Sequence, residues 1–537
     1  MNRRRFLHHG TQAALASALL PAAAGAAPAS ASPDLRERTI AELQGYLQSG
    51  QASSRDLCQW YLSRIAELNA QGPMLRAVLE LNPDALTLAD ELDRERKAGK
   101  VRGSLHGIPI LLKDNIDTAD RMHTTAGALA LAGHRATRDA FVVQQLRAAG
   151  AIILGKTNLS EWANFRSTSS VSGWSSRGGQ TRNPYVLDRV PSGSSAGSGA
   201  AVAASLCAVA VGTETNGSIV SPASCNGLVG LKPTVGLVSR TGIIPISATQ
   251  DTAGSMARTV RDAALLLAAM VGSDPADRAH ATPGFDMGMV SALLPGKYYT
   301  IRMIPNALSG RKLGVEKSHL ASKTAAGELL RQAMTVLRAQ GATVTEVDVI
   351  GATQSIGDAE FDVLLYEFKD GVNKYLAQAG ASVKTLADVI AFNQTHAAQA
   401  MPFFQQEILE MAEKTDGLGS AKYQAALRKV VDTSRAALDA ALASNGGLAA
   451  IVAITTGPAA CIDLVNGEYG TGPDYSGPAA MAGYPHLTVP MGQVHGLPVG
   501  LSFVGAAYNE AQLLALGYAY EQATRHRRAP EFRARVE

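Results

Sequence analysis

Short apolar runs alternate with amphipathic stretches along most of this 537-residue chain. The runs Ala77–Leu81, Ile108–Leu112 and Ala151–Gly155 have the length and composition of buried strands. Between them, the spacing of apolar residues predicts helices over Asp84–Lys97 and Ala140–Ala149. Strands that alternate with helices in this way are typical of an α/β fold, in which helices pack over a sheet.

The same alternation continues toward the end of the chain. Further strands are expected at Cys207–Gly212, close to Leu313, and at Thr343–Val347, Leu448–Thr455, Leu487–Met491 and Leu497–Val504. Further helices are expected at Ser54–Leu68, Gly199–Leu206, Ile219–Cys225, Ala325–Gln340 and Glu510–Thr524, and residues 359–442 read as mostly helical. No long linker or repeat interrupts this pattern. We therefore predict one domain over residues 27–537, with a helical elaboration over 359–442.

The first residues have the pattern of an export signal. Arg3, Arg4 and Arg5 precede Phe6-Leu7 and then an apolar stretch, which resembles a twin-arginine signal. Small-residue cleavage sites near residues 26 and 31 would leave a periplasmic or secreted protein. An ordinary secretory signal and a basic leader without export remain alternatives. Without residues 1–26 the formal charge falls from +3 to zero, so nothing favours nucleic acid or an anionic membrane as a partner.

The cysteine and histidine positions predict neither a metal site nor a cofactor site. The four cysteines are Cys58, Cys207, Cys225 and Cys461, and they show no CxxC spacing. We expect buried free thiols, although a bridged pair stays possible in an oxidising compartment. The 11 histidines include no HExxH pair, so we expect no metal and no cofactor.

Two serine-rich turns are candidates for nucleophilic chemistry. In the first, Gly193–Gly197 matches the GxSxG nucleophile elbow, with Ser195 at its centre. An elbow needs a strand before the serine, yet residues 183–191 read as a loop. It also needs a downstream acid and histidine, and nothing marks His486 or His495 for that role. A phosphate-binding loop at Gly155-Lys156-Thr157 lacks its upstream glycine.

The second turn, Gly212–Ser218, ends on a serine ahead of an expected short helix. Successive backbone N–H groups in such a turn can hold an oxyanion. Far upstream, Lys113 follows five apolar residues, and a buried lysine has a lowered pKa and can act as a base. His106 is a rival base. Taken singly, each feature also fits a surface turn or a strand-end lysine that points to solvent.

The order and spacing of these motifs resemble the amidase signature family of serine hydrolases over residues 35–530. The matching segments are Gly107–Asn115, Gly155–Trp162, Gly193–Gly199, Gly212–Ser218, Gly230–Thr234, Asp251–Gly254 and Gly496–Leu501. Within the family, the segments Ser160–Arg166, Gly178–Tyr185 and Gly212–Thr215 are similar to those of bacterial peptide amidases, which remove the C-terminal amide of peptides and release ammonia.

This resemblance implies a fold and a set of catalytic roles. The fold would be a single large domain with a mixed central sheet covered by helices on both faces. Ser218 would be the nucleophile, Ser194 on a cis peptide bond the bridging serine, and Lys113 the base. The backbone amides of Thr215, Asn216, Gly217 and Ser218 would form the oxyanion hole. We expect a monomer that needs no cofactor.

One residue departs from the family pattern. Asn216 stands where the broader family has glycine, so we expect it to tolerate a positive φ and to face the substrate cleft. Three alternatives to a peptide amidase stay open. They are an amidase for small aliphatic or aryl amides, an amidotransferase subunit that supplies ammonia to a partner, and a solute-binding protein without catalysis.

Overall fold

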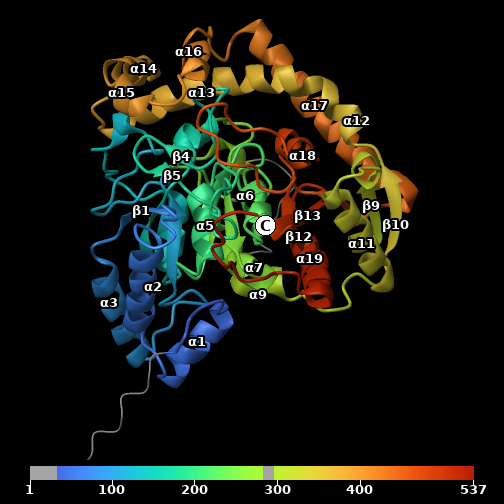
Figure 1. Cartoon of the computed structure of the whole chain (residues 1–537), viewed down its shortest axis with the longest axis horizontal. Coiled ribbons are helices and arrows are strands. Elements are labelled where there is room, and N and C mark those ends of the chain that lie inside the picture. Colours follow the sequence, from blue (N-terminus) through green and yellow to red (C-terminus); the bar gives the residue numbers. More distant parts are fainter. Residues whose placement is uncertain (1–32, 282–294, 537) are drawn as a thin grey trace, which may run out of the picture.

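A large mixed sheet organises the molecule (Figure 1). The computed structural model describes residues 33–281 and 295–536. The predicted signal over residues 1–26 and both of its cleavage sites lie outside the described residues, so export stays a prediction. Within the described residues, no helix is long and apolar enough to cross a membrane.

The strands of the main sheet are numbered along the chain and pair in a different order. In pairing order they are β1 (Val78–Leu81), β3 (Ile152–Thr157), β2 (Pro109–Lys113), β6 (Val209–Glu214), β8 (Thr252–Ala257), β7 (Val229–Lys232), β12 (His486–Val494), β13 (Leu497–Val504), β11 (Ala450–Ile454), β9 (Lys312–Glu316) and β10 (Thr343–Val347). A small separate sheet contains β4 (Trp174–Ser175) and β5 (Gly179–Gln180).

Helices connect and cover these strands. They are α1 (Ile40–Ser49), α2 (Ser54–Leu68), α3 (Ala85–Lys97), α4 (Phe141–Ala148), α5 (Ala196–Ala203), α6 (Val220–Cys225), α7 (Val260–Met270), α9 (Pro295–Thr300), α10 (Lys317–Leu320), α11 (Ala325–Ala339), α12 (Ile350–Thr353), α13 (Gly357–Ala379), α14 (Leu386–Thr395), α15 (Ala397–Ala400), α16 (Glu407–Glu413), α17 (Ala421–Ala443), α18 (Ser476–Ala482) and α19 (Glu510–Thr524). Short 3-10 turns are η1 (Leu129–Leu131), η2 (Glu161–Asn164), η3 (Arg278–Ala281), η4 (Gln354–Ile356) and η5 (Ser444–Gly446).

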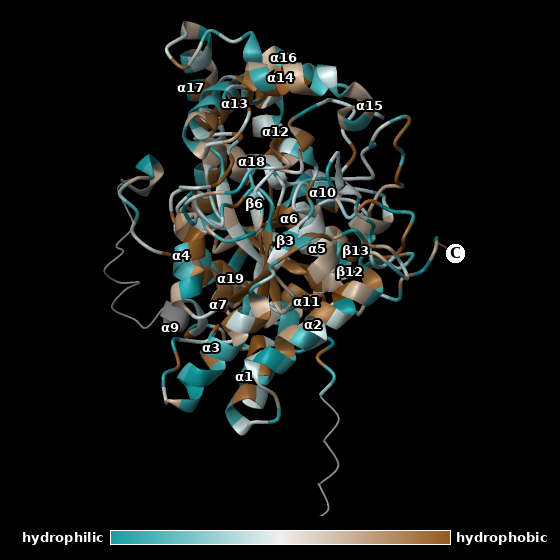
Figure 2. Ribbon diagram, turned by 90° about the vertical axis from the view of Figure 1, so that its left-hand side faces the viewer, coloured by the Kyte–Doolittle hydropathy of each residue, from teal (hydrophilic) through white to brown (hydrophobic). Residues whose placement is uncertain are grey.

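The connections place helices on both faces of the sheet. The crossover β2–α4–β3 and the crossover β3–α5–β6 run in opposite directions along the sheet. Since such crossovers are right-handed, α4 and α5 lie on opposite faces. Helix α7 packs beside α4 and against α19, whereas α6 packs beside α5 (Figure 2). The predicted α/β fold with a mixed, doubly covered sheet is therefore confirmed.

The centre of the sheet is buried on both faces. Every residue of β2, β3 and β6 is buried, which explains why their sequences read as continuous apolar runs rather than as alternating ones. Ile110, Leu111 and Leu112 are fully inaccessible, and burying each such side chain contributes about 1.5–3 kcal/mol. This core holds the carboxyl ends of β2 and β6 in a fixed relation.

Helices α13 to α17 lie along the top of the molecule in Figure 1 and account for most of residues 359–442. Leu365 and Phe368 of α13 pack on Trp162 and Phe165, which follow β3. The ring centroids of Phe165 and Phe368 are 5.1 Å apart. This helical region therefore rests on the loops at the carboxyl ends of the central strands.

Arg166 joins those loops to the helical region. Its Nη1 donates to Glu161 Oε1 at 2.7 Å and to Ala400 O at 2.7 Å, and its Nη2 donates to Phe404 O at 2.8 Å. The side chain is fully buried, with its guanidinium 4.4 Å from the centroid of the Phe404 ring. Arg166→Met should therefore lower the free energy of unfolding by about 3–5 kcal/mol, because it leaves Glu161 and the carbonyls without a donor. Denaturant unfolding measures this change.

Arg55→Met is the matched control. Arg55 pairs with Asp90 at 2.5 Å, but both side chains are 48% exposed. Removing that pair should cost less than about 1 kcal/mol. Equal losses in the two variants would contradict the role given to Arg166.

All four cysteines are free, as expected, and Cys58, Cys207 and Cys225 are buried, whereas Cys461 is half-buried. Burial raises the pKa of the Cys207 and Cys225 thiols to about 12, so both remain protonated at neutral pH. The three buried cysteines act as small apolar core residues.

Candidate active site

The parallel pairing of β2 with β6 brings Lys113 beside the turn that ends on Ser218. Leu112 is opposite Val211, so the next residue of β2, Lys113, lies near Thr213 of β6. The Lys113 Nζ donates to Thr213 Oγ1 at 2.9 Å and to Thr213 O at 3.1 Å. It also donates to Ser194 Oγ at 2.8 Å. The structure thus brings the expected base and the expected bridging serine into direct contact.

Burial makes the Lys113 amine a usable base. Loss of hydration lowers the pKa of Lys113 to about 7, although the nearby carboxyl groups of Asp251 and Glu214 act in the opposite direction. The pKa of the Asp251 carboxyl is itself raised by burial to about 6. A lysine with a pKa near neutrality is partly unprotonated at pH 7 and can accept a proton.

The Ser194 segment is tightly packed. The peptide bond between Gly193 and Ser194 is cis, as the family resemblance implies. Ser160 N donates to Ser194 O at 3.1 Å. A Cβ atom on Gly193 would lie 2.4 Å from Ser160 Oγ, so only glycine fits next to the serine. Gly197 is constrained in the same way, since its Cβ would lie 2.3 Å from Ala77 O.

The Ser218 turn is anchored at both of its sides. Ser195 N donates to Ser218 O at 3.2 Å, which ties this turn to the residue after Ser194. Glu214 Oε2 accepts from Ile219 N at 2.7 Å and from Val220 N at 3.0 Å. Ser218 is 8% exposed. Among the described residues no hydrogen bond joins Ser218 Oγ to Ser194 Oγ, so that contact of the expected triad is not formed in this structure.

Asn216 does not have the backbone conformation that we expected. The left-handed position of the turn is Gly217, with a φ of 83°, whereas Asn216 is not among the described residues with positive φ. The Asn216 side chain donates from Nδ2 to Glu360 Oε1 at 2.8 Å. Glu360 is in the first turn of α13, so Asn216 connects the turn to the helical region.

Ser195 has a structural environment rather than that of an elbow nucleophile. No strand precedes it in residues 183–192, as the sequence predicted. The side chain is fully buried, and its Oγ donates to Thr213 O at 3.0 Å and accepts from Thr213 N at 3.2 Å. Ser195 therefore holds Thr213, the residue that accepts from Lys113.

Two further lysines are fully buried, so burial alone does not identify the base. Lys156 Nζ donates to Ile116 O at 2.7 Å and to Thr124 Oγ1 at 2.9 Å. Lys232 Nζ donates to Pro233 O at 3.1 Å, and burial lowers the pKa of Lys232 to about 8. Only Lys113 of these three donates to a serine hydroxyl.

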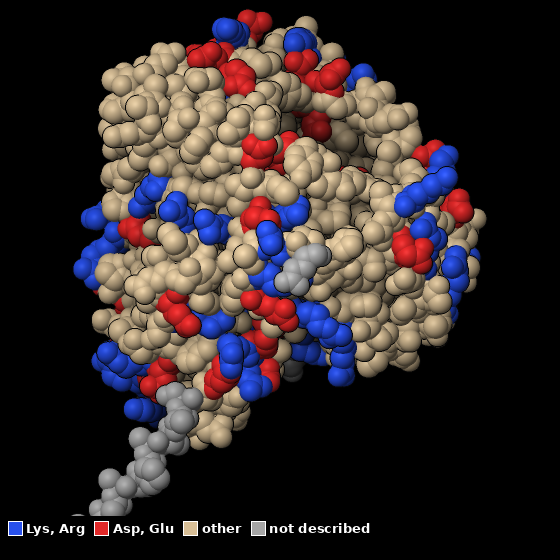
Figure 3. Space-filling model, viewed as in Figure 1, with Lys and Arg blue, Asp and Glu red and all other residues tan. Residues whose placement is uncertain are grey.

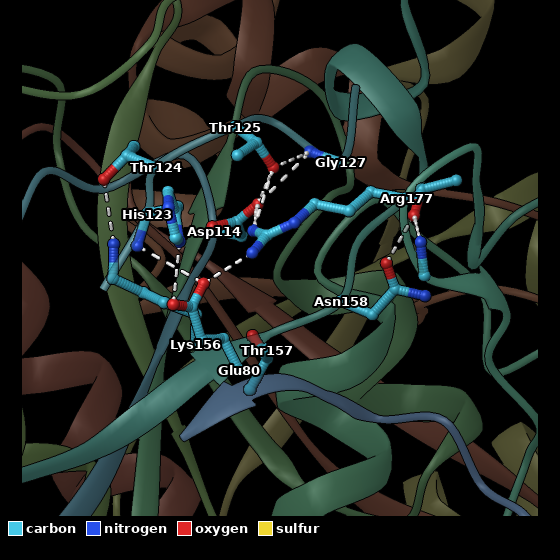
Figure 4. Close-up of polar contacts among 12 residues, drawn as sticks. Glu80, Asp114, His123, Thr124, Thr125, Gly127, Lys156, Thr157, Asn158 and Arg177 are labelled. Atoms are coloured by element: carbon cyan, nitrogen blue, oxygen red, sulfur yellow. Dashed lines mark hydrogen bonds and ion pairs between the residues drawn. The ribbon is translucent and has the colours of Figure 1, made fainter. Parts of the chain in front are cut away.

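Lys156 is part of a polar network that fixes the loop after Lys113 (Figure 4). The Asp114 carboxylate accepts from Thr125 Oγ1 and from Gly127 N, and Arg177 lies 3.5 Å from it. Arg177 also pairs with Glu80 of β1. These contacts involve no serine and explain why the Gly107–Asn115 and Gly155–Trp162 motifs occur together.

The other candidates from the sequence are not at this site. His106 Nε2 lies 3.0 Å from Leu92 O, and His106 is located before β2, at the strand end opposite to Lys113. His486 Nε2 lies 2.6 Å from Ser502 Oγ in the core. Within residues 33–281 and 295–536, no group of three or more His, Cys, Asp or Glu side chains is placed to hold a metal ion.

A cavity of about 360 Å³ lies between residues 240–252 and α13. Thr213, Thr215 and Asp251 line it, whereas Ser194 and Ser218 do not. The cavity therefore borders the partners of Lys113 rather than the two serines.

The sequence model of the Amidase family matches residues 56–514. The chain belongs to the amidase family. It is 51% identical to a peptide amidase from Stenotrophomonas maltophilia, whose crystal structure superposes with a TM-score of 0.87 over 93% of this chain and 99% of that chain. A probable amidase from Arabidopsis thaliana is 42% identical over 510 residues, which cover 93% of this chain and 92% of the relative.

Another relative is one component of an assembly, the glutamyl-tRNA(Gln) amidotransferase from Halorhodospira halophila. That relative is 34% identical over 524 residues, which cover 93% of this chain and 99% of the relative. The family makes the chain a hydrolase of amide C–N bonds. The solute-binding alternative is therefore wrong.

Several residues of the site were not found by sequence reasoning. Thr213 and Glu214 lie inside the recognised motif, but their contacts with Lys113 Nζ and with the amides after Ser218 depend on strand pairing. Glu360 lies 144 residues from Asn216 in an unremarkable helix, and no pattern in the chain links the two residues.

Proposed function

We propose that the substrate is the C-terminal carboxamide of a peptide, and that Ser218, Ser194 and Lys113 carry out its hydrolysis. The observation that carries this proposal is the 2.8 Å hydrogen bond between Lys113 Nζ and Ser194 Oγ in a fully buried setting. The similarity to a peptide amidase over 93% of the chain supports the choice of substrate.

In the acylation step, the proton moves along the three side chains. Neutral Lys113 accepts a proton from Ser194, which accepts one from Ser218. Ser218 Oγ then forms a bond to the carboxamide carbon, and the backbone N–H groups of Thr215–Ser218 stabilise the oxyanion. Loss of a single donor of this kind raises the barrier by about 3–4 kcal/mol in other hydrolases.

Collapse of the tetrahedral intermediate breaks the C–N bond. The proton returns through Ser194 to the leaving nitrogen, so ammonia departs and an ester to Ser218 remains. Water then attacks this ester, giving its proton to the same relay, and the product is a peptide with a free carboxylate. Proton and charge balance are restored without any group besides water.

A panel of amides tests the substrate assignment. Purified protein lacking residues 1–26 should release ammonia from peptide amides, and more slowly from amino-acid amides, while peptides with free C-termini give none. An enzyme assay for ammonia measures each rate. Efficient hydrolysis of simple aliphatic or aryl amides, with no reaction of peptide amides, would instead establish the small-amide alternative.

A further inference from the structure

Asn216 and Gln250 converge on one oxygen of Glu360. Asn216 Nδ2 lies 2.8 Å from Glu360 Oε1, and Gln250 Nε2 lies 2.9 Å from the same oxygen. Gln250 Nε2 also lies 3.4 Å from Thr215 O. Glu360 is therefore held against the turn whose amides are the proposed oxyanion donors.

The contacts leave two acceptor oxygens without a partner beside the turn. Among the described residues, no hydrogen bond reaches Glu360 Oε2. Gln250 is 1% exposed, and its Oε1 is buried without a partner within the described part of the chain. A buried carbonyl oxygen without a donor is uncommon, since leaving it unpaired costs free energy. A ligand with several N–H donors would satisfy both oxygens.

No basic side chain neutralises Glu360. In residues 33–281 and 295–536, Glu360 forms no ion pair with lysine or arginine. Burial raises the pKa of the Glu360 carboxyl, and the Gln250 and Asn216 donors act in the opposite direction.

Two more carboxylates without an ion pair in the described part of the chain lie near the serine turns. Glu468 accepts from Ser172 N at 2.7 Å, and Ser172 borders Gly193. Asp474 accepts from Ser476 Oγ at 2.8 Å, and Ser476 borders Gly217. Figure 3 shows a hollow beneath the helices at the top of the molecule, with acidic atoms visible inside it.

We infer that Glu360, together with Gln250 Oε1, forms a subsite for a positively charged group of the substrate, an ammonium or a guanidinium, next to the scissile amide. This inference rests on the proposed function, because it assigns the side-chain preference of the same site. The ammonium or guanidinium donates to Glu360 Oε2 and Gln250 Oε1, while Oε1 of Glu360 stays bound to Asn216. The same negative charge disfavours acidic substrates and weakens binding of the carboxylate product.

Matched peptide amides test the subsite. N-acetyl-Ala-Xaa-amide and N-acetyl-Xaa-Ala-amide, with Xaa as lysine, glutamine or glutamate, place a positive, neutral or negative group at two distances from the scissile bond. The quantity compared is the ratio of kcat/KM for the lysine and glutamate peptides, measured at mildly alkaline pH. The variant is Glu360→Gln, which keeps the shape of the side chain. The control is Asp358→Asn in the same first turn of α13, where Asp358 is exposed.

The wild type should prefer the lysine peptide by about tenfold or more in at least one series, as expected for one charge pair at a partly solvated site. Glu360→Gln should bring this ratio close to one, whereas Asp358→Asn should keep the wild-type ratio. An unchanged ratio in Glu360→Gln, or an equal fall in both variants, would overturn the subsite. The glutamine peptides report separately on the proposed function: if the wild type hydrolyses none of them, the peptide assignment fails. Lysine, glutamine and glutamic acid α-amides then still measure the charge ratio.

Discussion

Ser218→Ala is expected to lower kcat for a peptide amide by at least about four orders of magnitude while leaving the fold intact. The reason is that the variant removes the only atom that forms a bond to the substrate in the proposed acylation step. The contacts that hold the turn come from Glu214 and from the backbone of Ser195, so they do not depend on the Ser218 hydroxyl. Ammonia release and thermal unfolding measure the two expectations.

Ser195→Ala separates this assignment from the alternative that the GxSxG pattern suggests. Ser195 Oγ bonds to the backbone of Thr213, so its loss should destabilise the protein by about 1–3 kcal/mol and leave measurable turnover. If Ser195→Ala abolished turnover in a folded protein and Ser218→Ala did not, Ser195 would be the nucleophile and the account would be wrong.

Lys113→Met is expected to lower kcat/KM by about 10²–10⁴-fold, because the apolar side chain cannot accept the proton of Ser194. In the wild type, kcat/KM should rise with pH and level off above about pH 7, where the Lys113 amine becomes neutral. The variant should lose this rising limb. Initial rates at low substrate concentration across a pH series measure both effects.

Stability distinguishes a catalytic role of Lys113 from a structural one. The pKa of Lys113 is lowered from 10.5 to about 7 on folding. The unfolded chain therefore binds more protons between these values, so the Lys113 contribution to stability becomes more favourable as the pH rises through this window. At pH 7 the shift corresponds to a cost of about 4 kcal/mol, which Lys113→Met removes. An inactive variant that is no less stable than the wild type at pH 7 supports the base assignment, whereas unchanged activity would contradict it.

The elements with clear boundaries could be predicted closely from the sequence. The strands β10 and β13 and the helix α19 have the predicted bounds, because turn residues flank a run of one periodicity. Helix α5 begins at Ala196 rather than at Gly199, since its glycine-rich first turn carries no helical signal.

The strands β7 and β8 could not be predicted in this way. Their sequences, VGLK and TAGSMA, are short and contain glycine, so neither alternation nor a long apolar run marks them. Both strands are buried at the centre of the sheet and pair with each other. Their strand conformation depends on neighbours that are distant in the sequence, which single-sequence patterns do not register.

The site divides along similar lines. Lys113, Ser194 and Ser218 were expected from motifs at fixed spacing, and the structure brings the first two into contact. Asn216 was expected to have a positive φ, but Gly217 has it instead. The partner of Asn216, Glu360, comes from a helix packed over the turn, and only tertiary structure brings the two residues together.

Trapping with hydroxylamine tests the central claim, an acyl-enzyme on Ser218, most directly. With a peptide amide as substrate, hydroxylamine competes with water for the ester, so the wild type should form the peptide hydroxamate together with ammonia. Mass spectrometry measures the hydroxamate, and Ser218→Ala should form none. Ammonia release without any hydroxamate, over a range of hydroxylamine concentrations that leaves the enzyme folded, would contradict the acyl-enzyme and favour direct attack by water.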